Sequence, residues 1–242
     1  MATRVTRVVI AGGGIVGVPL AYAVKAKLHG KVDVTLVSDG SDFHFVPANP
    51  WVALGLRAAE DVTFALEPLL SARKIALQPD AVQSIDPERS RLGLAGGVEL
   101  EYDYLVIATG IRPDWNGVPG AVGNPRVQSV IRPTDAVAAQ AAYAEFLKHP
   151  GPGPVVVAAA PRVPTIGPMY EYAFLLDADL RRRALRERVP ITLVTPEPYP
   201  GHVGLDKPVA REALTDALRR EGIEWIGNAA LERCEDRTLR FT

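Results

Sequence analysis

The chain has 242 residues, with 27 lysines and arginines against 28 aspartates and glutamates and a formal net charge of −1. A balance this even provides no global field for nucleic acid, so no nucleic-acid partner is expected. The single cysteine, Cys234, excludes an intramolecular disulfide and a cysteine-rich zinc site, and no metal site is expected. A chain with so little sulfur is typical of a reducing, cytoplasmic compartment. No apolar run reaches the roughly 18 residues of a membrane-spanning helix.

The first predicted element is a strand over residues 5–11, a short apolar and β-branched run typical of a buried parallel strand. It leads directly into the turn Gly12-Gly13-Gly14-Ile15-Val16-Gly17. A helical pattern follows over residues 15–28, and residues 32–37 predict a second apolar strand. This order of strand, glycine turn, helix and strand is the βαβ unit of dinucleotide-binding folds.

Each glycine of the Gly12-x-Gly14-x-x-Gly17 pattern has a steric role. Gly12 permits the tight turn out of the strand, Gly14 lets the backbone approach a pyrophosphate, and Gly17 allows close packing of helix on strand. The N-terminus of the helix offers free N–H groups to the phosphates. Ser38 and Asp39 end the second strand, at the spacing from which a side chain accepts from ribose hydroxyls. The alternatives are a glycine turn without a ligand and, for Ser38-Asp39, a plain strand-end turn.

Further along the chain, predicted strands and helices continue to alternate. We predict strands at 81–85, 91–94, 99–101 and 104–108, a helix at 134–148, a strand at 155–159, a helix at 168–188, a strand at 191–195, a helix at 208–221, and strand-like stretches at 225–234 and 238–241. This pattern predicts an α/β fold with a Rossmann-like lobe over residues 1–112 and a second, partly complete Rossmann-like lobe over residues 113–242. The last strand has no partner strand after it, which predicts a truncated second lobe.

The second lobe differs from the first at its strand-to-helix turn. After the strand the sequence reads Ala158-Ala159-Ala160-Pro161-Arg162-Val163-Pro164. Without glycines, and with two prolines, the backbone is poorly shaped for a pyrophosphate, so no NAD(P)H site is predicted there. Five arginines between residues 181 and 188 predict a solvated face near a helix C-terminus, with an anion site as the alternative.

Several segments resemble one family of flavoproteins. They are Gly12–Gly17; Asp42-Phe43-His44-Phe45-Val46-Pro47 with Pro50-Trp51-Val52; Tyr102-Asp103-Tyr104-Leu105-Val106-Ile107-Ala108-Thr109-Gly110; Gly167-Pro168-Met169-Tyr170-Glu171; and Val194-Thr195-Pro196-Glu197-Pro198-Tyr199-Pro200-Gly201-His202. Together they span nearly the whole chain and resemble the sulfide:quinone oxidoreductase family, which is related to flavocytochrome c sulfide dehydrogenase. The Ala-Thr-Gly strand end is shared by many flavoproteins with two dinucleotide-binding domains, whereas Pro-Trp-Val and Thr-Pro-Glu-Pro-Tyr are more particular to this branch.

The resemblance implies that the first lobe binds FAD. It assigns cofactor contacts to Gly12, Gly14 and Gly17 at the pyrophosphate, Ser38 at the adenosine ribose, the backbone of Val82 at the adenine, Thr109 and Gly110 beside the FAD chain, and Pro47 near the flavin. A simple exit from the strand is the alternative for Thr109-Gly110. The resemblance also implies that Glu171 and His202 assist proton movement as catalytic residues. The alternative for Glu171 is a carboxylate that is favourable in the first turn of a helix without any catalytic role. The alternative for His202 is an ordinary histidine of a loop.

Three departures from the family affect the chemistry. Thr165 stands where the family has its sulfide-oxidising cysteine, and a threonine hydroxyl forms no persulfide. A second family cysteine aligns near Ile131 or Arg132, where there is no sulfur. The acidic neighbours of Cys234 predict a raised thiol pKa and a structural role. Family members also continue past this sequence, so the resemblance predicts a C-terminally truncated chain with an incomplete FAD lobe and without the helices that dock on the membrane.

The leading hypothesis is an FAD-dependent oxidoreductase of the sulfide:quinone type, which passes electrons from sulfide through flavin to a quinone. Such a protein is expected in the cytoplasm, with a full-length form peripheral to the membrane. One alternative is an inactive shortened homologue that acts as a nucleotide-binding or interaction module, which Thr165 favours. The other is an NADH-dependent quinone reductase, which the turn at 158–164 disfavours.

Overall fold

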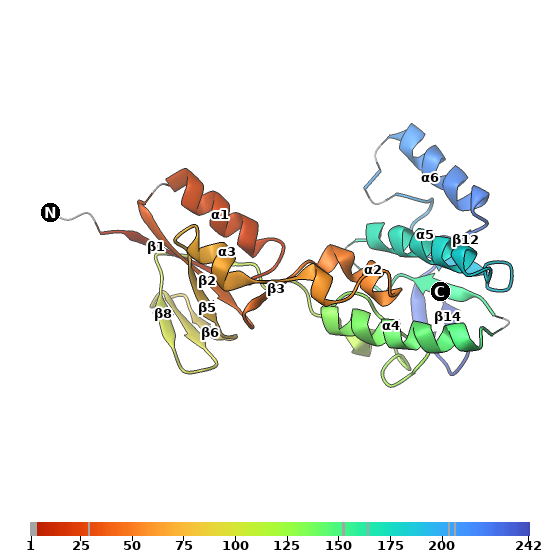
Figure 1. Ribbon diagram of the computed structural model, residues 1–242, viewed down its shortest axis with the longest axis horizontal. Helices are drawn as coiled ribbons and strands as arrows, with labels where there is room; N and C mark the ends of the chain where they lie inside the picture. The colour runs from red at the N-terminus through yellow and green to blue at the C-terminus, as the bar shows by residue number, and fades with distance from the viewer. Residues whose placement is uncertain (1–3, 29, 152, 164, 203, 206) are drawn as a thin grey trace. The chain divides into compact units, whose positions relative to one another are not determined.

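The computed structural model describes residues 4–28, 30–151, 153–163, 165–202, 204–205 and 207–242 (Figure 1). The chain forms two compact units, of which unit 1 consists of Met1–Val46 and Glu60–Arg112 and unit 2 of Pro47–Ala59 and Pro113–Thr242. The segment Pro47–Ala59, which the sequence placed in the first lobe, therefore belongs to unit 2. Each unit has its own parallel sheet and its own core.

Unit 1 is built on a four-stranded parallel sheet. Its strands, in the order β5-β2-β1-β9, are β5 (Ala76–Pro79), β2 (Val32–Ser38), β1 (Thr6–Ala11) and β9 (Tyr104–Ile107). Ala11 is in register with Val37 on one side and with Ile107 on the other. Because the strands are parallel, the residues that follow β1, β2 and β9 all emerge at the same edge of the sheet.

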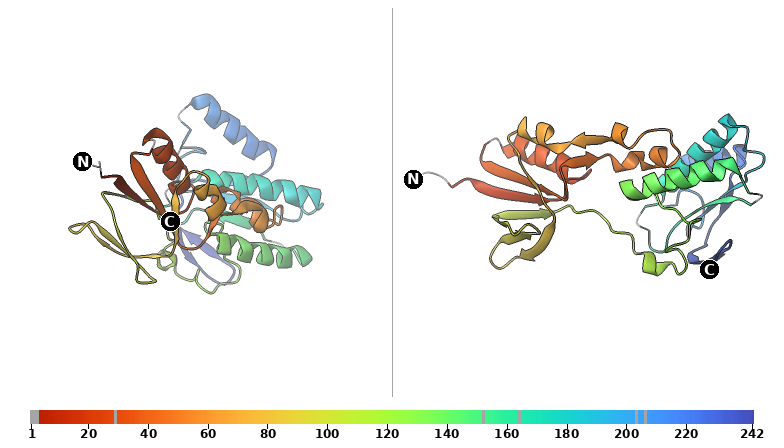
Figure 2. Two further views of the ribbon diagram at one scale, coloured as in Figure 1. Left: turned by 60° about the vertical axis from the view of Figure 1, so that its left-hand side comes forward. Right: turned by 60° about the horizontal axis from the view of Figure 1, so that its bottom comes forward.

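Side chains of the sheet alternate between two apolar layers, as expected for parallel strands that are buried on both faces. Val8, Ile10 and Leu36 pack with helices α1 (Gly17–Leu28) and α3 (Leu66–Ser71). Val9 and Val37 pack on the other face, against an antiparallel meander of β6 (Val82–Asp86), β7 (Arg91–Leu94) and β8 (Glu99–Glu101). Figure 2 shows the sheet between α1 and this meander.

Two short strands complete unit 1 as an antiparallel ribbon. They are β3 (Asp42–His44) and β4 (Thr63–Ala65), and the 3₁₀ turn η2 (Glu60–Val62) leads into β4. The sequence analysis missed β3, β4, β5 and α3. Each has six residues or fewer, which is too short for a repeating apolar pattern to develop.

Unit 2 has a three-stranded parallel sheet in the order β10-β11-β12. Its elements are η1 (Val46–Ala48), α2 (Asn49–Ala53), η3 (Trp115–Gly117), α4 (Pro133–Lys148), β10 (Val155–Ala158), α5 (Gly167–Arg182), β11 (Ile191–Val194), α6 (Pro208–Arg220) and β12 (Glu224–Ile226). Its main core joins Leu54 after α2, Tyr143 of α4, Leu176 of α5 and Leu193 of β11. The predicted α/β Rossmann-like fold with parallel sheets is therefore confirmed. No helix of the described residues has the length and apolarity to cross a membrane.

The end of the chain differs from the prediction at one stretch. The strand expected over 225–234 is two strands, β12 and β13 (Leu231–Cys234), because the chain leaves the sheet at Gly227 and Asn228, the latter with a left-handed φ of 52°. The last strand, β14 (Leu239–Phe241), pairs antiparallel with β13. A hairpin turn thus returns the last strand to the strand that precedes it.

Helix α5 ends at Arg182 rather than at Arg188. Ala184 takes a left-handed φ of 55°, and Leu185 N donates to Leu180 O at 2.8 Å across the turn that ends the helix. The arginines in the last turn of the helix and just after it are partly exposed, and each of the following four has a carboxylate partner. Arg181 and Arg186 donate to the buried Asp177, and Arg182 and Arg183 to the buried Asp179. Two interior carboxylates thus anchor four of the five arginines.

Candidate dinucleotide-binding site

The glycine turn after β1 is held tightly by its neighbours. Gly12 N donates to Val37 O at 2.7 Å, and Ala108 N donates to Ala11 O at 2.7 Å. Gly12 has a φ of 122°, which disfavours any side chain, and a Cβ there would overlap Ala108 O. A Cβ at Gly17 would overlap Gly12 O, where α1 crosses closest to the turn. The fold itself therefore requires glycine at both positions.

Gly14 is different, because a Cβ placed there would meet no protein atom within 4 Å. Neither packing nor a positive φ requires glycine at this position. Gly14 lies in the turn just before α1, whose first turn has no acidic residue. Free N–H groups and the positive end of a helix dipole favour an anion there, and no carboxylate of that turn competes for it. The turn has the form of a phosphate cradle.

Other predicted contact residues of unit 1 meet the turn at the same edge of the sheet. Ser38 is buried at the end of β2, and a Cβ on Gly13 would overlap its Oγ. Asp39 is exposed immediately after it. Thr109 and Gly110, also exposed, follow β9 directly. The parallel register of the three strands places these residues at the same edge of the sheet as the glycine turn.

Val82 and Pro47 belong to other elements of the chain. Val82 begins β6, and its side chain packs on the cluster that contains Val9 and Val37. Pro47 lies in η1 and is exposed, but it belongs to unit 2. Of the residues predicted to contact the cofactor, Pro47 thus belongs to unit 2 and the others belong to unit 1.

After β10, unit 2 has a strand-to-helix turn with the same backbone design as the glycine turn of unit 1. We call each of these two turns a corner. Ala159 N donates to Val194 O at 3.0 Å, in the manner of Gly12 N and Val37 O. The carboxylate that follows the neighbouring strand, Glu197, is only 2% exposed and accepts a hydrogen bond from Tyr170 OH at 2.6 Å. Burial, together with this bond to Glu197, raises the pKa of Tyr170 well above its usual value. The acidic group at this strand end is therefore directed into the protein.

The two predicted proton-handling residues are both exposed residues of unit 2. Glu171 is the fifth residue of α5, past the first turn in which the sequence analysis placed it, and its Oε1 accepts from Trp51 Nε1 at 3.2 Å. His202 lies in the loop after β11, with its ring edge-on to Tyr199 at 4.8 Å between centroids. Among the described residues, no hydrogen bond joins Glu171 to His202.

The sulfur chemistry of the chain is limited by two positions. Thr165, in place of the family cysteine, is exposed just before α5. Cys234 is 5% exposed at the end of β13, where it packs with Val118, Ala121 and Leu231. Burial raises the pKa of the Cys234 thiol. The predicted direction was right, but burial rather than the acidic neighbours is the cause.

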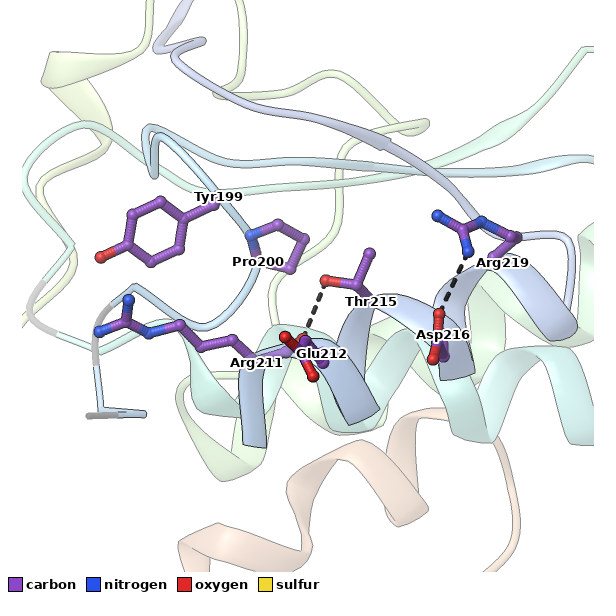
Figure 3. A pocket seen from close by; sticks show the side chains of 7 residues that line it. All are labelled: Tyr199, Pro200, Arg211, Glu212, Thr215, Asp216 and Arg219. Carbon is purple, nitrogen blue, oxygen red and sulfur yellow. Dashed lines mark hydrogen bonds and ion pairs between the residues drawn. The ribbon is translucent and has the colours of Figure 1, made fainter. Parts of the chain in front are cut away.

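A hollow of about 370 Å³ in unit 2 contains none of the predicted site residues. It lies between the loop after β11 and one face of α6, and Tyr199, Pro200, Arg211, Glu212, Thr215, Asp216 and Arg219 line it (Figure 3). The side chain of Arg211 covers the Tyr199 ring at 4.6 Å, and Arg219 is paired with Asp216 at 3.1 Å. Since its cations already have partners, this hollow is not a ready anion site.

The fold and the glycine turn define a protein with dinucleotide-binding domains of the flavoprotein type. Residues 6–163 match the family of pyridine nucleotide-disulphide oxidoreductases. The chain belongs to this family, and within it is similar to the sulfide:quinone oxidoreductases.

The relatives support that placement. The chain is 38% identical over 229 residues to the sulfide-quinone reductase of Aquifex aeolicus, an alignment that covers 94% of this chain and 52% of that protein. It is 27% identical over 188 residues to the mitochondrial sulfide:quinone oxidoreductase of Dictyostelium discoideum, covering 77% and 41%. The crystal structure of the Aquifex aeolicus sulfide:quinone oxidoreductase superposes with a TM-score of 0.88 at 35% identity, over 98% of this chain and 54% of that one. The chain thus spans about half the length of these relatives.

Proposed function

We propose that unit 1 binds the ADP part of FAD and that the chain serves in an oxidoreductase of the sulfide:quinone type. The supporting observation is the contrast among the motif glycines. Gly12 and Gly17 are fixed by contacts within the chain, whereas Gly14 borders open space at the start of α1. A glycine kept where the protein does not need it is explained by a ligand that approaches the backbone there. FAD is the cofactor that the family binds.

The proposed contacts are those that the resemblance to the family implies. The backbone of Gly12, Gly14 and Gly17, with the N-terminus of α1, holds the pyrophosphate. Ser38 and Asp39 accept from the ribose hydroxyls, since they end the neighbouring strand. The backbone of Val82 faces the adenine, Thr109 and Gly110 pass beside the extended cofactor, and Pro47 lies near the flavin. The bound flavin supplies the two-electron chemistry, and the chain orients it and limits its access to water.

Sulfide as electron donor and quinone as acceptor are proposed from the names of the similar proteins. In that reaction the proton-handling roles fall to Glu171 and His202, which are both exposed to solvent and able to exchange protons with it. Neither Thr165 nor the buried Cys234 provides an accessible thiolate. Electrons from the donor therefore reach the flavin without a persulfide at these two positions.

The direct experiment is to purify the chain, record its visible absorbance, and titrate the cofactor-free protein with FAD. We expect flavin absorbance bands and saturable binding. A colourless protein that ignores added FAD contradicts the proposal. Sulfide-dependent reduction of a soluble quinone, measured on the FAD-loaded chain, then tests the donor and acceptor.

A second candidate function is a nucleotide-binding or interaction module without turnover. The observations that favour it are Thr165 in the cysteine position and the burial of Cys234. FAD binding without sulfide-dependent quinone reduction supports this candidate, and turnover excludes it. An NADH-dependent quinone reductase is disfavoured by the glycine-free turn after β10 and by the buried Glu197. Bleaching of the flavin absorbance on addition of NADH would support the NADH-dependent quinone reductase instead.

A further inference from the structure

The loop that follows β11 carries an exposed imidazole on a buried support. Pro200 and Gly201 are buried, whereas His202, directly after them, is exposed. Gly201 has a left-handed φ of 74°, and a Cβ there would lie 2.5 Å from Leu205 Cδ1. Leu205 N donates to Gly201 O at 3.1 Å across the same turn. His202 is thus presented to solvent by a turn that is itself packed into unit 2.

The imidazole also has an aromatic partner on the same loop. The His202 and Tyr199 rings lie 4.8 Å apart between centroids, with their planes at 88°, an arrangement that aromatic pairs favour. The guanidinium of Arg211 covers the Tyr199 ring at 4.6 Å (Figure 3). Arg211 Nε also donates to Leu205 O at 2.8 Å, which fastens the loop to α6. The contact between the two rings gives the imidazole a defined orientation.

One buried hydroxyl holds the backbone immediately before this histidine. Tyr170 OH donates to Glu197 Oε2 at 2.6 Å and accepts from Gly201 N at 3.1 Å. A tyrosine hydroxyl has one proton, so its donation to the carboxylate leaves the oxygen lone pairs to accept from the N–H group. Tyr170 and Glu197 are 7% and 2% exposed, and bonds in series strengthen each other in such surroundings. A side chain of α5 therefore sets the position of the Gly201 N–H group.

The two ends of this contact adjoin both residues that were predicted to handle protons. Tyr170 directly precedes Glu171 in α5, and Gly201 directly precedes His202 in the loop. The hydroxyl thus ties the helix that carries the carboxylate to the loop that carries the imidazole. A group that transfers protons has to be held within reach of its partner. Loss of this bond is expected to displace the imidazole while Glu171 stays on its helix.

We propose that Tyr170 is a positioning residue for His202, which it holds in place through the Gly201 N–H group while Glu197 orients its hydroxyl. The importance of this position for turnover rests on the proposed function, whereas the positioning itself is independent of it. Burial and the bond to Glu197 raise the pKa of Tyr170 well above its usual value, so the hydroxyl keeps its proton. Tyr170 therefore acts through the loop backbone and not as a proton carrier.

The first experiment observes the His202 ring by NMR of the histidine-labelled chain at about pH 8.5, where an ordinary imidazole is neutral. His202→Gln removes one set of imidazole resonances and so assigns them. Tyr199→Leu removes the neighbouring ring and so gives the resonance positions without its ring current. We expect Tyr170→Phe to move the His202 resonances at least half of the way from the wild-type positions to those of Tyr199→Leu. Resonances that stay in place overturn the proposal.

The matched control is Tyr143→Phe. Tyr143 is also a buried tyrosine of unit 2, and its hydroxyl donates to the buried Asp179 Oδ2 at 2.8 Å. Among the described residues no hydrogen bond joins it to the loop after β11. We expect Tyr143→Phe to lower the free energy of unfolding about as much as Tyr170→Phe does, with the His202 resonances unmoved. Equal movement in the two variants would reflect a general loss of structure and overturn the proposal.

If Tyr170→Phe fails to fold, hydrogen exchange of the wild-type chain provides the test. The Gly201 amide is buried and bonded to Tyr170 OH. We expect it to exchange at least about a hundredfold more slowly than an amide of an unstructured peptide. Exchange at the rate of such a peptide overturns the proposal.

Turnover of the FAD-loaded chain with sulfide and a soluble quinone measures the consequence for the reaction. We expect Tyr170→Phe to lower kcat by about three- to tenfold with KM near the wild-type value, because a displaced proton carrier loses part of its catalytic contribution. Tyr143→Phe should change neither constant. A wild-type kcat in Tyr170→Phe overturns the catalytic importance of the positioning. Absence of turnover in the wild-type chain contradicts the proposed function instead, and the NMR experiment then decides the positioning alone.

Discussion

The two strand-to-helix corners of this chain share a backbone plan and differ in their side chains. In unit 1 the corner passes through glycines and leaves open space at Gly14, and the acid after the next strand, Asp39, is exposed. In unit 2 the corresponding turn has no glycine, and the acid after the next strand, Glu197, is buried against Tyr170. The two turns thus differ in their glycines and in whether the following acid faces solvent or is bonded within the chain.

This contrast distinguishes the backbone features that both turns need for the fold from the side-chain features that a binding site needs. Both turns donate a backbone N–H to the neighbouring strand, at 2.7 Å from Gly12 and at 3.0 Å from Ala159. The βαβ geometry thus forms with or without glycine at the turn. Binding of a dinucleotide depends on a few absent Cβ atoms and on whether one carboxylate faces solvent. Three predictions test this difference, and a fourth concerns the polar interior of unit 2.

The largest effect is expected from Gly17→Ala in unit 1. The added Cβ would overlap Gly12 O, a backbone atom that cannot move without distorting the turn. We expect a loss of about 3 kcal/mol or more in the free energy of unfolding, measured by urea denaturation. Gly14→Ala is the control, with a change within about 0.5 kcal/mol, because its Cβ enters open space. Equal losses in the two variants would mean that the glycines do not differ in role.

Tyr170→Phe tests the closed corner of unit 2. The change removes the hydroxyl that donates to Glu197 Oε2 and accepts from Gly201 N. A buried carboxylate oxygen and a buried N–H then lose a partner, which is expected to cost about 2 kcal/mol. Tyr199→Phe is the matched control, since that ring is stacked by Arg211 rather than held by its hydroxyl. If the free energy of unfolding falls no more in Tyr170→Phe than in Tyr199→Phe, the hydrogen bond between Tyr170 and Glu197 does not stabilise this turn.

The sequence predicted the open corner better than the closed one. Glycine roles follow from the spacing of Gly12, Gly14 and Gly17 alone, because each role is local and steric. The partners of Glu197 and Asp179 were missed, since Tyr170 and Tyr143 reach them only after α4 and α5 pack. From sequence alone, a carboxylate in a loop or helix is predicted to be exposed, because such long-range contacts are not visible there.

Short elements and chain reversals account for the other differences. The pattern over 168–188 is helical in composition, and nothing in it marks the left-handed residue Ala184 that ends α5. Likewise β3 and β4 have three residues each, too few for an alternating pattern. That the segment Pro47–Ala59 leaves unit 1 and joins unit 2 follows from packing of Leu54 into the core of unit 2, which spacing along the chain does not encode.

Gly14→Ala also tests the ligand directly. The new methyl group occupies the space assigned to the pyrophosphate, so we expect FAD affinity to fall by about tenfold or more, equivalent to about 1.4 kcal/mol, with the fold intact. The matched control is Gly167→Ala at the start of α5, where a Cβ also meets nothing within 4 Å. Titration of the cofactor-free proteins with FAD measures both. The same loss in Gly167→Ala would remove the distinction between the corners.

The smallest effect concerns the polar interior of unit 2 away from its corner. Burial opposes ionisation of Asp179, but hydrogen bonds from Arg182, Arg183 and Tyr143 outweigh it and lower its pKa. A carboxyl with a lowered pKa in the folded state stabilises the protein above its unfolded pKa of about 4, and this stability is lost as the pH falls through the folded value.

Asp179→Asn keeps the size of the side chain and one acceptor oxygen, so we expect it to cost about 1 kcal/mol at neutral pH. The difference from wild type should then shrink below about pH 4, because the wild-type carboxyl is itself becoming neutral. Urea denaturation from pH 3 to pH 7 measures it. Asp216→Asn, whose carboxyl is 65% exposed in its pair with Arg219, should show almost no difference at any pH. A penalty for Asp179→Asn that stays constant down to pH 3 would place its stabilisation in packing rather than in charge.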